Sequence, residues 1–295
     1  MTGEAAVTAR PGQRTRFLRN AVDTFLRHRL ATFGMVYLLI VGAAIAFEPL
    51  LGLPDPNKID LLSTFAPPSA EHPLGTDENG RDVLARLIAG ARVSLAVGLA
   101  GAALTVLVAS IVGVVSGYFG GTVDNVIMRL TDGFMAIPTF FLLMIVVSIW
   151  GSSFTILVLA LAFTRWMGVA RLVRAEVLRF KESEFITAAR ALGASNLRLM
   201  VVHLLPQATP SLIVATSLNV GIVMLVEAGL SFLGLGILPP TPSWGNMLSA
   251  SQNYMWIAPA LAIYPGVLIL LAVLAFNAIG DVLRDILDPR YRSRR

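Results

Sequence analysis

Long apolar stretches separated by short polar segments set the pattern of this chain. Six stretches carry at most one charged residue each, and they cover residues 31–47, 93–117, 133–150, 152–170, 207–226 and 257–280. Each is close to the roughly 17–25 residues that an α-helix needs to cross a bilayer. Their one charged residue is Arg165, which we expect to face protein or to extend toward the cytoplasmic surface. The pattern predicts an all-α integral membrane protein with six transmembrane helices.

Residues 184–206, between the fourth and fifth stretches, follow a different pattern. Gly193 suits the left-handed turn that ends a helix, Ser195 suits the cap of a second helix, and Pro206 disfavours helix at Leu205. This predicts a short helical hairpin whose apolar face either lies on lipid or contacts another protein. The apolar residues recur twice at the i, i+3, i+4, i+7 spacing of one helix face: Phe185, Ala188, Ala189 and Leu192, then Leu197, Met200, Val201 and Leu204.

Positive charges are distributed unevenly around the apolar stretches. Arginines crowd residues 1–30, the region 171–198 and the end of the chain, whereas residues 48–82 hold seven acids against one Lys and one Arg. Because cytoplasmic loops retain Lys and Arg, we predict that both termini and the hairpin are cytoplasmic and that 48–91 is external. The net charge of +5 is then a consequence of topology, the basic tail lies against the lipid headgroups of the bilayer, and no nucleic-acid partner is expected.

Composition supports this class of protein. Hydrophobic residues make up 56% of the chain and charged residues 14%, against about 45–50% and 25% in soluble domains. We divide the chain into a cytoplasmic basic leader (1–30), a first transmembrane helix (31–47), an external segment (48–91), a five-helix core (92–280) that includes the cytoplasmic hairpin (182–206), and a cytoplasmic basic tail (281–295).

The chain lacks the motifs of common catalytic sites. There is no cysteine, which removes disulfides and thiol chemistry. The patterns G-x-x-x-x-G-K-[ST], H-E-x-x-H and G-x-S-x-G do not occur, and the three histidines, His28, His72 and His203, are scattered. We therefore predict no catalytic, cofactor or metal site, and any ATP-hydrolysing motor would be another chain.

Glycine and proline positions predict close packing and bends. Gly113 and Gly117, four residues apart, allow two helices to approach closely. Pro138, Pro259 and Pro265 predict kinks in the third and sixth spans.

A few polar and aromatic residues stand out. Glu227 interrupts the fifth stretch and must be hydrated, paired or protonated, so it either lines a solute route or anchors packing. Trp244 follows three prolines in the uncharged segment 238–256, where a membrane-interface belt and a gate or partner contact are both open. At the cytoplasmic end of the third stretch, three residues form either a locking network or a solvated helix end: Asp124, Arg129 and Asp132.

Four segments taken together resemble the dipeptide, oligopeptide and nickel permease family of ABC importers, and its C-type subunit in particular. They are HPLGTDENGRDVLARLIAGARVSLAVG (72–98), GYFGGTVDNVIMRLTDGFMAIP (117–138), SFLGLGILPPTPSWGNML (231–248) and VLAFNAIGDVLRDILDPR (273–290). The resemblance extends over residues 17–290 and implies the type I ABC importer permease fold in a prokaryotic cytoplasmic (inner) membrane. It also implies four partners besides lipid: a second, B-type permease, two ATP-binding subunits and an extracellular solute-binding protein.

The hairpin resembles the loop that such permeases present to their ATPase. Thr187 stands where the family has Glu, and His203 stands where it has Ile. Glu184, one helical turn before Thr187, is the candidate for the missing polar contact. The resemblance implies these ATPase-coupling residues: Glu184, Thr187, Ala188, Ala189, Gly193, Leu205 and Pro206.

The resemblance further implies alternating access without chemistry on the solute. Di- or oligopeptides are the expected solutes, and nickel or an oligosaccharide is the alternative within the family. A secondary transporter or channel is the alternative of a different class, and it would favour paired intramembrane ionisable groups or an inverted repeat. A membrane enzyme is a third class, which the missing catalytic motifs disfavour.

Overall fold

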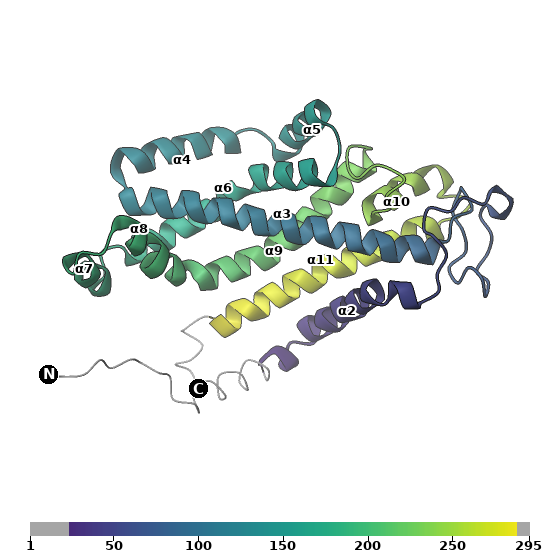
Figure 1. Ribbon diagram of the computed structural model, residues 1–295, viewed down its shortest axis with the longest axis horizontal. Helices are drawn as coiled ribbons and strands as arrows, with labels where there is room; N and C mark the ends of the chain where they lie inside the picture. The colour runs from purple at the N-terminus through teal and green to yellow at the C-terminus, as the bar shows by residue number, and fades with distance from the viewer. Residues whose placement is uncertain (1–23, 288–295) are drawn as a thin grey trace.

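The computed structural model describes residues 24–287, which are mostly helical (Figure 1). Among these residues, five single helices are long and apolar enough to cross a membrane: α2 (Arg29–Ala46), α3 (Val83–Phe119), α6 (Phe154–Phe180), α9 (Leu205–Phe232) and α11 (Ala260–Leu287). The helices α4 (Gly121–Met135) and α5 (Thr139–Trp150), bent by 84° at a short break, form a sixth span when they are counted as one. The expected six-span, all-α membrane architecture is confirmed on that count.

Short elements gather at the two ends of the bundle. In Figure 1, α7 and α8 lie at one end, and the loop before α3 and α10 lie at the other. The start of α2 and the end of α11 point toward the α7 end. The short elements are η1 (Glu48–Leu50), η2 (Leu61–Ser63), α7 (Glu184–Ala191), α8 (Asn196–Arg198), the π-helical η3 (Leu199–Leu204), α10 (Trp244–Ser251) and η4 (Gln252–Tyr254).

Helix α3 runs through the middle of the bundle and packs against α6 and α9. A Cβ atom added at Gly113 would lie 2.5 Å from the carbonyl oxygen of Ala170, and one added at Gly117 would lie 2.9 Å from Val177. Since real Cβ atoms do not approach so closely, both glycines are needed for the α3–α6 contact. The spacing predicted from sequence therefore serves packing within this chain.

The span predicted at 93–117 lies within a longer helix. Helix α3 begins at Val83, where the Asp82 side chain caps it by accepting a hydrogen bond from the backbone N–H of Ala85 at 2.7 Å. The amphipathic stretch before residue 93 and the apolar stretch after it are thus one rigid element of 37 residues.

The span predicted over 133–150 is broken at Pro138, where a kink was predicted. Helix α4 ends at Met135 and α5 begins at Thr139, because Pro138 has no backbone N–H and disfavours helix at Ile137. Pro265, in contrast, lies inside the continuous helix α11, and Pro259 directly precedes that helix. Residues 1–23 of the predicted leader and 288–295 of the tail lie outside the described residues.

Candidate functional site

Helix α7 is a short amphipathic helix that follows directly on the end of α6. Ser183 joins the two helices: its hydroxyl donates to the carbonyl of Phe180 at 2.6 Å, and its own carbonyl accepts from the Thr187 hydroxyl at 3.2 Å. Glu184 lies in the first turn of α7 and Arg190 in the last, which matches the helix dipole. Helix α7 is thereby held close to α6 by local hydrogen bonds.

The turn after α7 has the conformation predicted from sequence. Gly193 has φ +83°, and its N–H donates to the carbonyl of Arg190 at 3.0 Å. A Cβ atom at Gly193 would meet nothing within 4 Å, so the backbone conformation alone requires glycine there. Ser195 caps α8 as expected, with its hydroxyl accepting from the N–H of Arg198.

The prediction that Pro206 disfavours helix at Leu205 is wrong, because α9 begins at Leu205. The N–H of Leu205 donates to the carbonyl of Met200, five residues earlier, which is the pattern of a π-helix. This wider turn accommodates the ring and the missing N–H of Pro206, so helix continues from Asn196 to Phe232. The second arm of the predicted hairpin is therefore the beginning of the long α9 span rather than a separate short helix.

The inner faces of these segments anchor them to the bundle. Ile186 of α7 and Leu199 and Leu204 of η3 are buried, and they belong to one apolar cluster with Val173 and Val177 of α6. This cluster therefore joins α7 to both α6 and η3.

The outer face of the same segments is apolar and uncovered. Leu192 is 89% exposed, and Phe185, Leu197 and Val201 are also exposed.

The coupling residues predicted from sequence fall into two groups that differ in exposure. Glu184, Thr187, Ala188, Gly193 and Pro206 are exposed, whereas Ala189 and Leu205 are half-buried.

Two ion pairs connect α4 to α6 near this end of the bundle. Asp124 accepts two hydrogen bonds from Arg174, at 2.6 and 2.5 Å, and a third from the hydroxyl of Ser116. Asp132 pairs with Arg171. Of the two alternatives left open for Asp124, Arg129 and Asp132, the structure has ion pairs for the two acids, and each acid pairs across the helices with an arginine of α6.

Arg129 itself is exposed and forms no ion pair with any described residue. Sequence reasoning also missed the bond from the hydroxyl of Tyr118 to Oδ1 of Asn196, at 2.7 Å, which connects α3 to α8. The only sequence signal for the ion pairs between α4 and α6 was the placement of Arg171 and Arg174 three residues apart on one helix face.

At the other end of the bundle, Glu227 and Trp244 hold α10 in place. Glu227 is 1% exposed, and its Oε1 accepts from the hydroxyls of Ser231 at 2.7 Å and Ser243 at 3.4 Å. This burial favours the packing alternative for Glu227. Trp244 is 0% exposed, so it is neither a surface belt residue nor an exposed partner contact in this chain. The exposed tryptophan of that segment is Trp256, at 99%.

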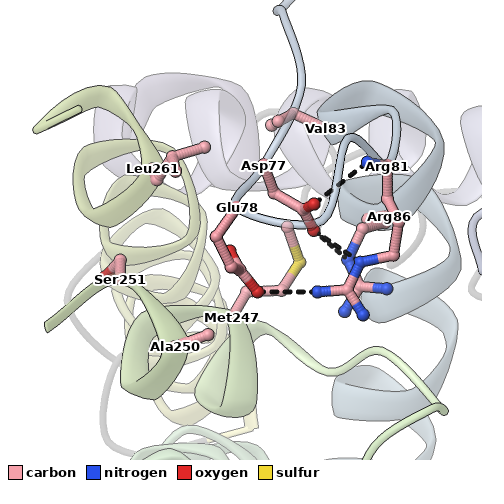
Figure 2. A pocket seen from close by; sticks show the side chains of 9 residues that line it. All are labelled: Asp77, Glu78, Arg81, Val83, Arg86, Met247, Ala250, Ser251 and Leu261. Atoms are coloured by element: carbon pink, nitrogen blue, oxygen red, sulfur yellow. Dashed lines mark hydrogen bonds and ion pairs between the residues drawn. The ribbon is translucent and has the colours of Figure 1, made fainter. Parts of the chain in front are cut away.

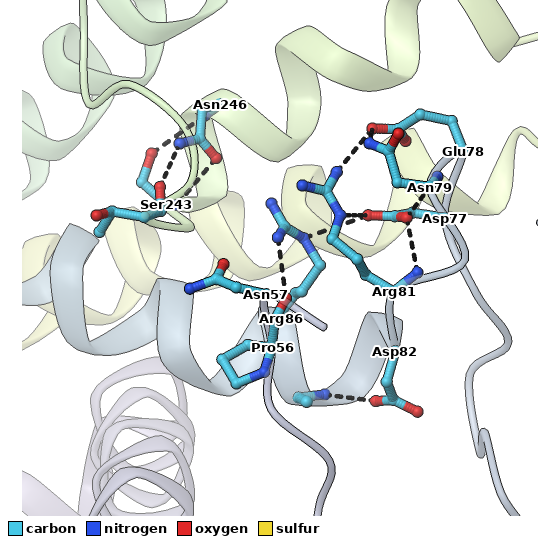
Figure 3. A network of polar contacts seen from close by, with 12 residues as sticks. Pro56, Asn57, Asp77, Glu78, Asn79, Arg81, Asp82, Arg86, Ser243 and Asn246 are labelled. Carbon is cyan, nitrogen blue, oxygen red and sulfur yellow. Dashed lines mark hydrogen bonds and ion pairs between the residues drawn. The ribbon is translucent and has the colours of Figure 1, made fainter. Parts of the chain in front are cut away.

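A buried polar network orders the external segment before α3 (Figure 3). Oδ2 of Asp77 accepts from Nε of Arg81 at 2.7 Å and lies 3.4 Å from Nε of Arg86. Nη2 of Arg81 donates to Glu78 at 2.8 Å, and Nη1 of Arg86 donates to the carbonyl of Pro56 at 3.0 Å. The sequence indicated only a capped helix here, because the pairing depends on how the loop folds back.

This network adjoins a small pocket against α10 and α11 (Figure 2). Its volume of about 20 Å³ is the space of a single water. Met247, Ala250 and Ser251 of α10 and Leu261 of α11 form the opposite wall. The pocket is too small for a solute, and the network serves to hold the external segment against these two helices.

Comparisons with known proteins agree on one family. The model of the family described as "Binding-protein-dependent transport system inner membrane component" matches residues 109–293. The chain is 40% identical to the nickel transport system permease protein NikC of Escherichia coli (strain K12), over 91% of this chain and 97% of that protein. It is 38% identical to the glutathione transport system permease protein GsiD of Pectobacterium atrosepticum, over 91% and 90%. It is 34% identical to the oligopeptide transport system permease protein OppC of Bacillus subtilis, over 93% and 90%.

Proposed function

The chain belongs to the family of binding-protein-dependent transport system inner membrane components, and from that premise we propose that it passes di- or oligopeptides through an ATP-driven importer. It is a multi-pass permease subunit of the ABC importer type, without an ATPase site of its own. Members of this family work with a second permease, ATPases and a binding protein. For this chain, we propose three kinds of partner: a B-type permease, two ATP-binding subunits and an extracellular solute-binding protein.

One observation carries the coupling part of the proposal: α7 is anchored on one side and uncovered on the other. Ile186 is buried in the apolar cluster that it shares with α6 and η3, while Phe185 of α7 and Leu192, directly after its last residue, are exposed. With eight residues, α7 is too short to cross a bilayer. We expect an ATP-binding subunit to cover this apolar face. Glu184 and Thr187, exposed beside it, would supply polar contacts at its rim.

Movement of α7 would reach the membrane through three helices. Helix α6 is joined to α7 by Ser183, and α9 continues from η3 without a break. Helix α4 would follow α6 because Asp124 pairs with Arg174. Closure of the ATP-binding subunits would tilt these spans and open the pathway to the outside, and hydrolysis would return them, provided that the two conformations differ in affinity for nucleotide and solute.

The opposite end of the bundle fits contact with the solute-binding protein. The buried network around Asp77 and Arg81 holds the external segment, and Glu227 and Trp244 hold α10, so this end is a rigid surface. Rigid surfaces lose less entropy on association. This assignment requires the orientation predicted from the arginines, with α7 and both termini cytoplasmic.

Nickel is the second candidate solute, because the nickel transport permease matches this chain at 40% identity. Permeases named for oligopeptides and dipeptides match at 34% and 38%. The test is uptake by the whole complex, reconstituted in vesicles with its partner permease, ATP-binding subunits and binding protein. We expect ATP-dependent accumulation of a labelled tripeptide. Uptake of Ni²⁺ alone, or uptake driven by an ion gradient without ATP, would contradict the peptide proposal.

A further inference from the structure

Arg165 is a charged residue in the middle of a membrane-spanning helix. It lies eleven residues after Phe154, the first residue of α6, and nine residues before Arg174, where α6 pairs with α4. At 1.5 Å per residue these separations are roughly 16 and 13 Å. Arg165 is therefore far from both ends of the hydrophobic region, where an unpaired charge is costly.

The guanidinium of Arg165 has no partner among the described residues. Its Nε is buried without a hydrogen-bond partner, and no ion pair joins the side chain to any acid in residues 24–287. The neighbouring hydroxyl of Thr164 donates to the carbonyls of Ala160 and Leu161. Nothing in the described chain thus neutralises this cation.

A second polar atom without a partner lies at the same level. The hydroxyl of Thr105 in α3 is buried and makes no hydrogen bond. A Cβ atom at Gly101 would lie 3.8 Å from Leu161, and α3 and α6 run parallel, so Thr105 and Arg165 each lie one turn beyond that contact. At the depth of Arg165, α3 and α6 therefore each carry a buried polar atom without a partner.

Arg165 lies on a stripe of α6 that contains further charged residues, unlike a lipid-facing surface. Residues at i, i+3, i+7, i+11 and i+14 share this face. A Cβ at Gly168 would meet nothing within 4 Å, and Leu172 is exposed, so the stripe is uncovered in this chain at these two positions. Glu176 follows, accepting from the hydroxyl of Ser211 at 2.7 Å. Arg179 ends the stripe.

An uncovered face of α11 gives the contrast. Within residues 260–280 of α11, the exposed residues are all apolar: Ile263, Val267, Leu270 and Leu274. Charged residues inside spans face the bundle interior or a water-filled cavity, whereas lipid is met by apolar residues. The stripe that begins at Arg165 therefore belongs to a hydrated space, and it leads along α6 toward α7.

We propose that Arg165 binds a carboxylate group of the solute as the solute crosses the membrane, an inference that rests on the peptide function proposed above. A guanidinium binds a carboxylate through two parallel charge-assisted hydrogen bonds, which fixes the geometry of the pair. A peptide with a free C-terminal carboxylate satisfies the charge of Arg165 during passage. A bare divalent cation such as Ni²⁺ would be repelled there.

The test uses the complete complex in proteoliposomes and two probes, trialanine and trialanine amide, which differ only in the terminal carboxylate. Affinity of the purified binding protein for each probe is measured separately, and both are supplied at saturation. Arg165→Gln should lower uptake of trialanine about tenfold and leave uptake of the amide within about twofold. Arg165→Lys, which keeps the charge, should recover part of the loss. Arg129→Gln, an exposed arginine of α4, is the matched control.

Binding-protein-stimulated ATPase activity should stay near wild type in Arg165→Gln, because coupling at α7 is unchanged. An equal loss for both probes, with less assembled complex recovered, would indicate that Arg165 pairs with a carboxylate of the second permease and not with the solute, and it would overturn the proposal. Unchanged uptake of trialanine would also overturn it. A wild-type complex that imports neither probe would overturn the peptide function and this inference together, which separates the two failures.

Discussion

The indole nitrogen of Trp244 donates a hydrogen bond to the backbone carbonyl of Leu87 at 2.9 Å, across 157 residues of chain. The backbone N–H of Trp244 donates in addition to the hydroxyl of Ser94 at 3.1 Å. Helix α10 is therefore fixed to the first half of α3 by two hydrogen bonds and a fully buried ring. A Cβ at Gly90 would approach this ring at 3.3 Å, so α3 lies directly against it.

Substitutions at Trp244 should separate the hydrogen bond from the packing. Trp244→Phe should cost roughly 1–3 kcal/mol, since it removes the indole hydrogen bond to the carbonyl of Leu87 and leaves part of the buried space of the ring empty. Trp244→Ala should cost about 3–5 kcal/mol, because it also opens a cavity. The measurement is thermal unfolding of the purified complex, with Trp256→Ala as the exposed control. Equal stability of Trp244→Ala and Trp256→Ala would contradict the buried position of Trp244.

The ion pair between α4 and α6 should matter to stability and transport. Arg174→Gln leaves the Asp124 carboxylate without its main partner, and we expect a loss of about 1.5–3 kcal/mol, typical of hydrogen bonds to charged groups. Uptake per ATP hydrolysed should also fall, because α4 no longer follows α6. Arg129→Gln should change either quantity little. If the two variants behave alike, the pair has no role in coupling.

The external loop depends on one glycine for space and conformation. Gly80 has φ +70°, and a Cβ there would lie 1.7 Å from the carbonyl oxygen of Asp60. Gly80→Ala should therefore disrupt the loop around the Asp77 network and expose it to protease. Gly52 has φ +62° with nothing within 4 Å, so Gly52→Ala measures the backbone strain alone, about 1–2 kcal/mol. Equal protease sensitivity in the two variants would show that the Asp60 contact is unimportant.

Membrane orientation can be tested in the natural cysteine-free background. Cysteine at Thr64, exposed in the loop before α3, should react with an impermeant maleimide added outside. Cysteine at Arg198, exposed at the α7 end, should react only after permeabilisation. The opposite pattern would reverse the orientation inferred from the arginines.

Local features of this chain were predictable from sequence because their causes are local. Uncharged stretches mark spans, Gly193 marks a left-handed turn, and Ser195 marks a cap. The choice of long-range partners was not predictable in this way. Nothing near Asp124 in sequence indicates that Arg174, fifty residues away, is its partner.

Pro138 and Pro206 show that a local sequence rule can hold at one position and fail at another. The rule that proline disfavours helix at the preceding residue holds at Pro138, where α4 and α5 meet at 84°. The same rule fails at Pro206, where the π-helical turn of η3 absorbs the ring. The difference lies in the neighbours, because Leu199 and Leu204 are buried in a cluster that stabilises continuous helix.

We propose that the exposed face of α7 receives an ATP-binding subunit and couples it to transport. Leu192→Asp disrupts this face without disturbing the fold of the isolated chain, because Leu192 is 89% exposed. The measurement is tripeptide uptake per ATP hydrolysed by the reconstituted complex. Thr122→Asp on α4 is the control, because it adds the same charge at the same end. We expect uptake to fall at least about tenfold for Leu192→Asp and to stay near wild type for Thr122→Asp. Wild-type uptake with Leu192→Asp would contradict a coupling role for α7.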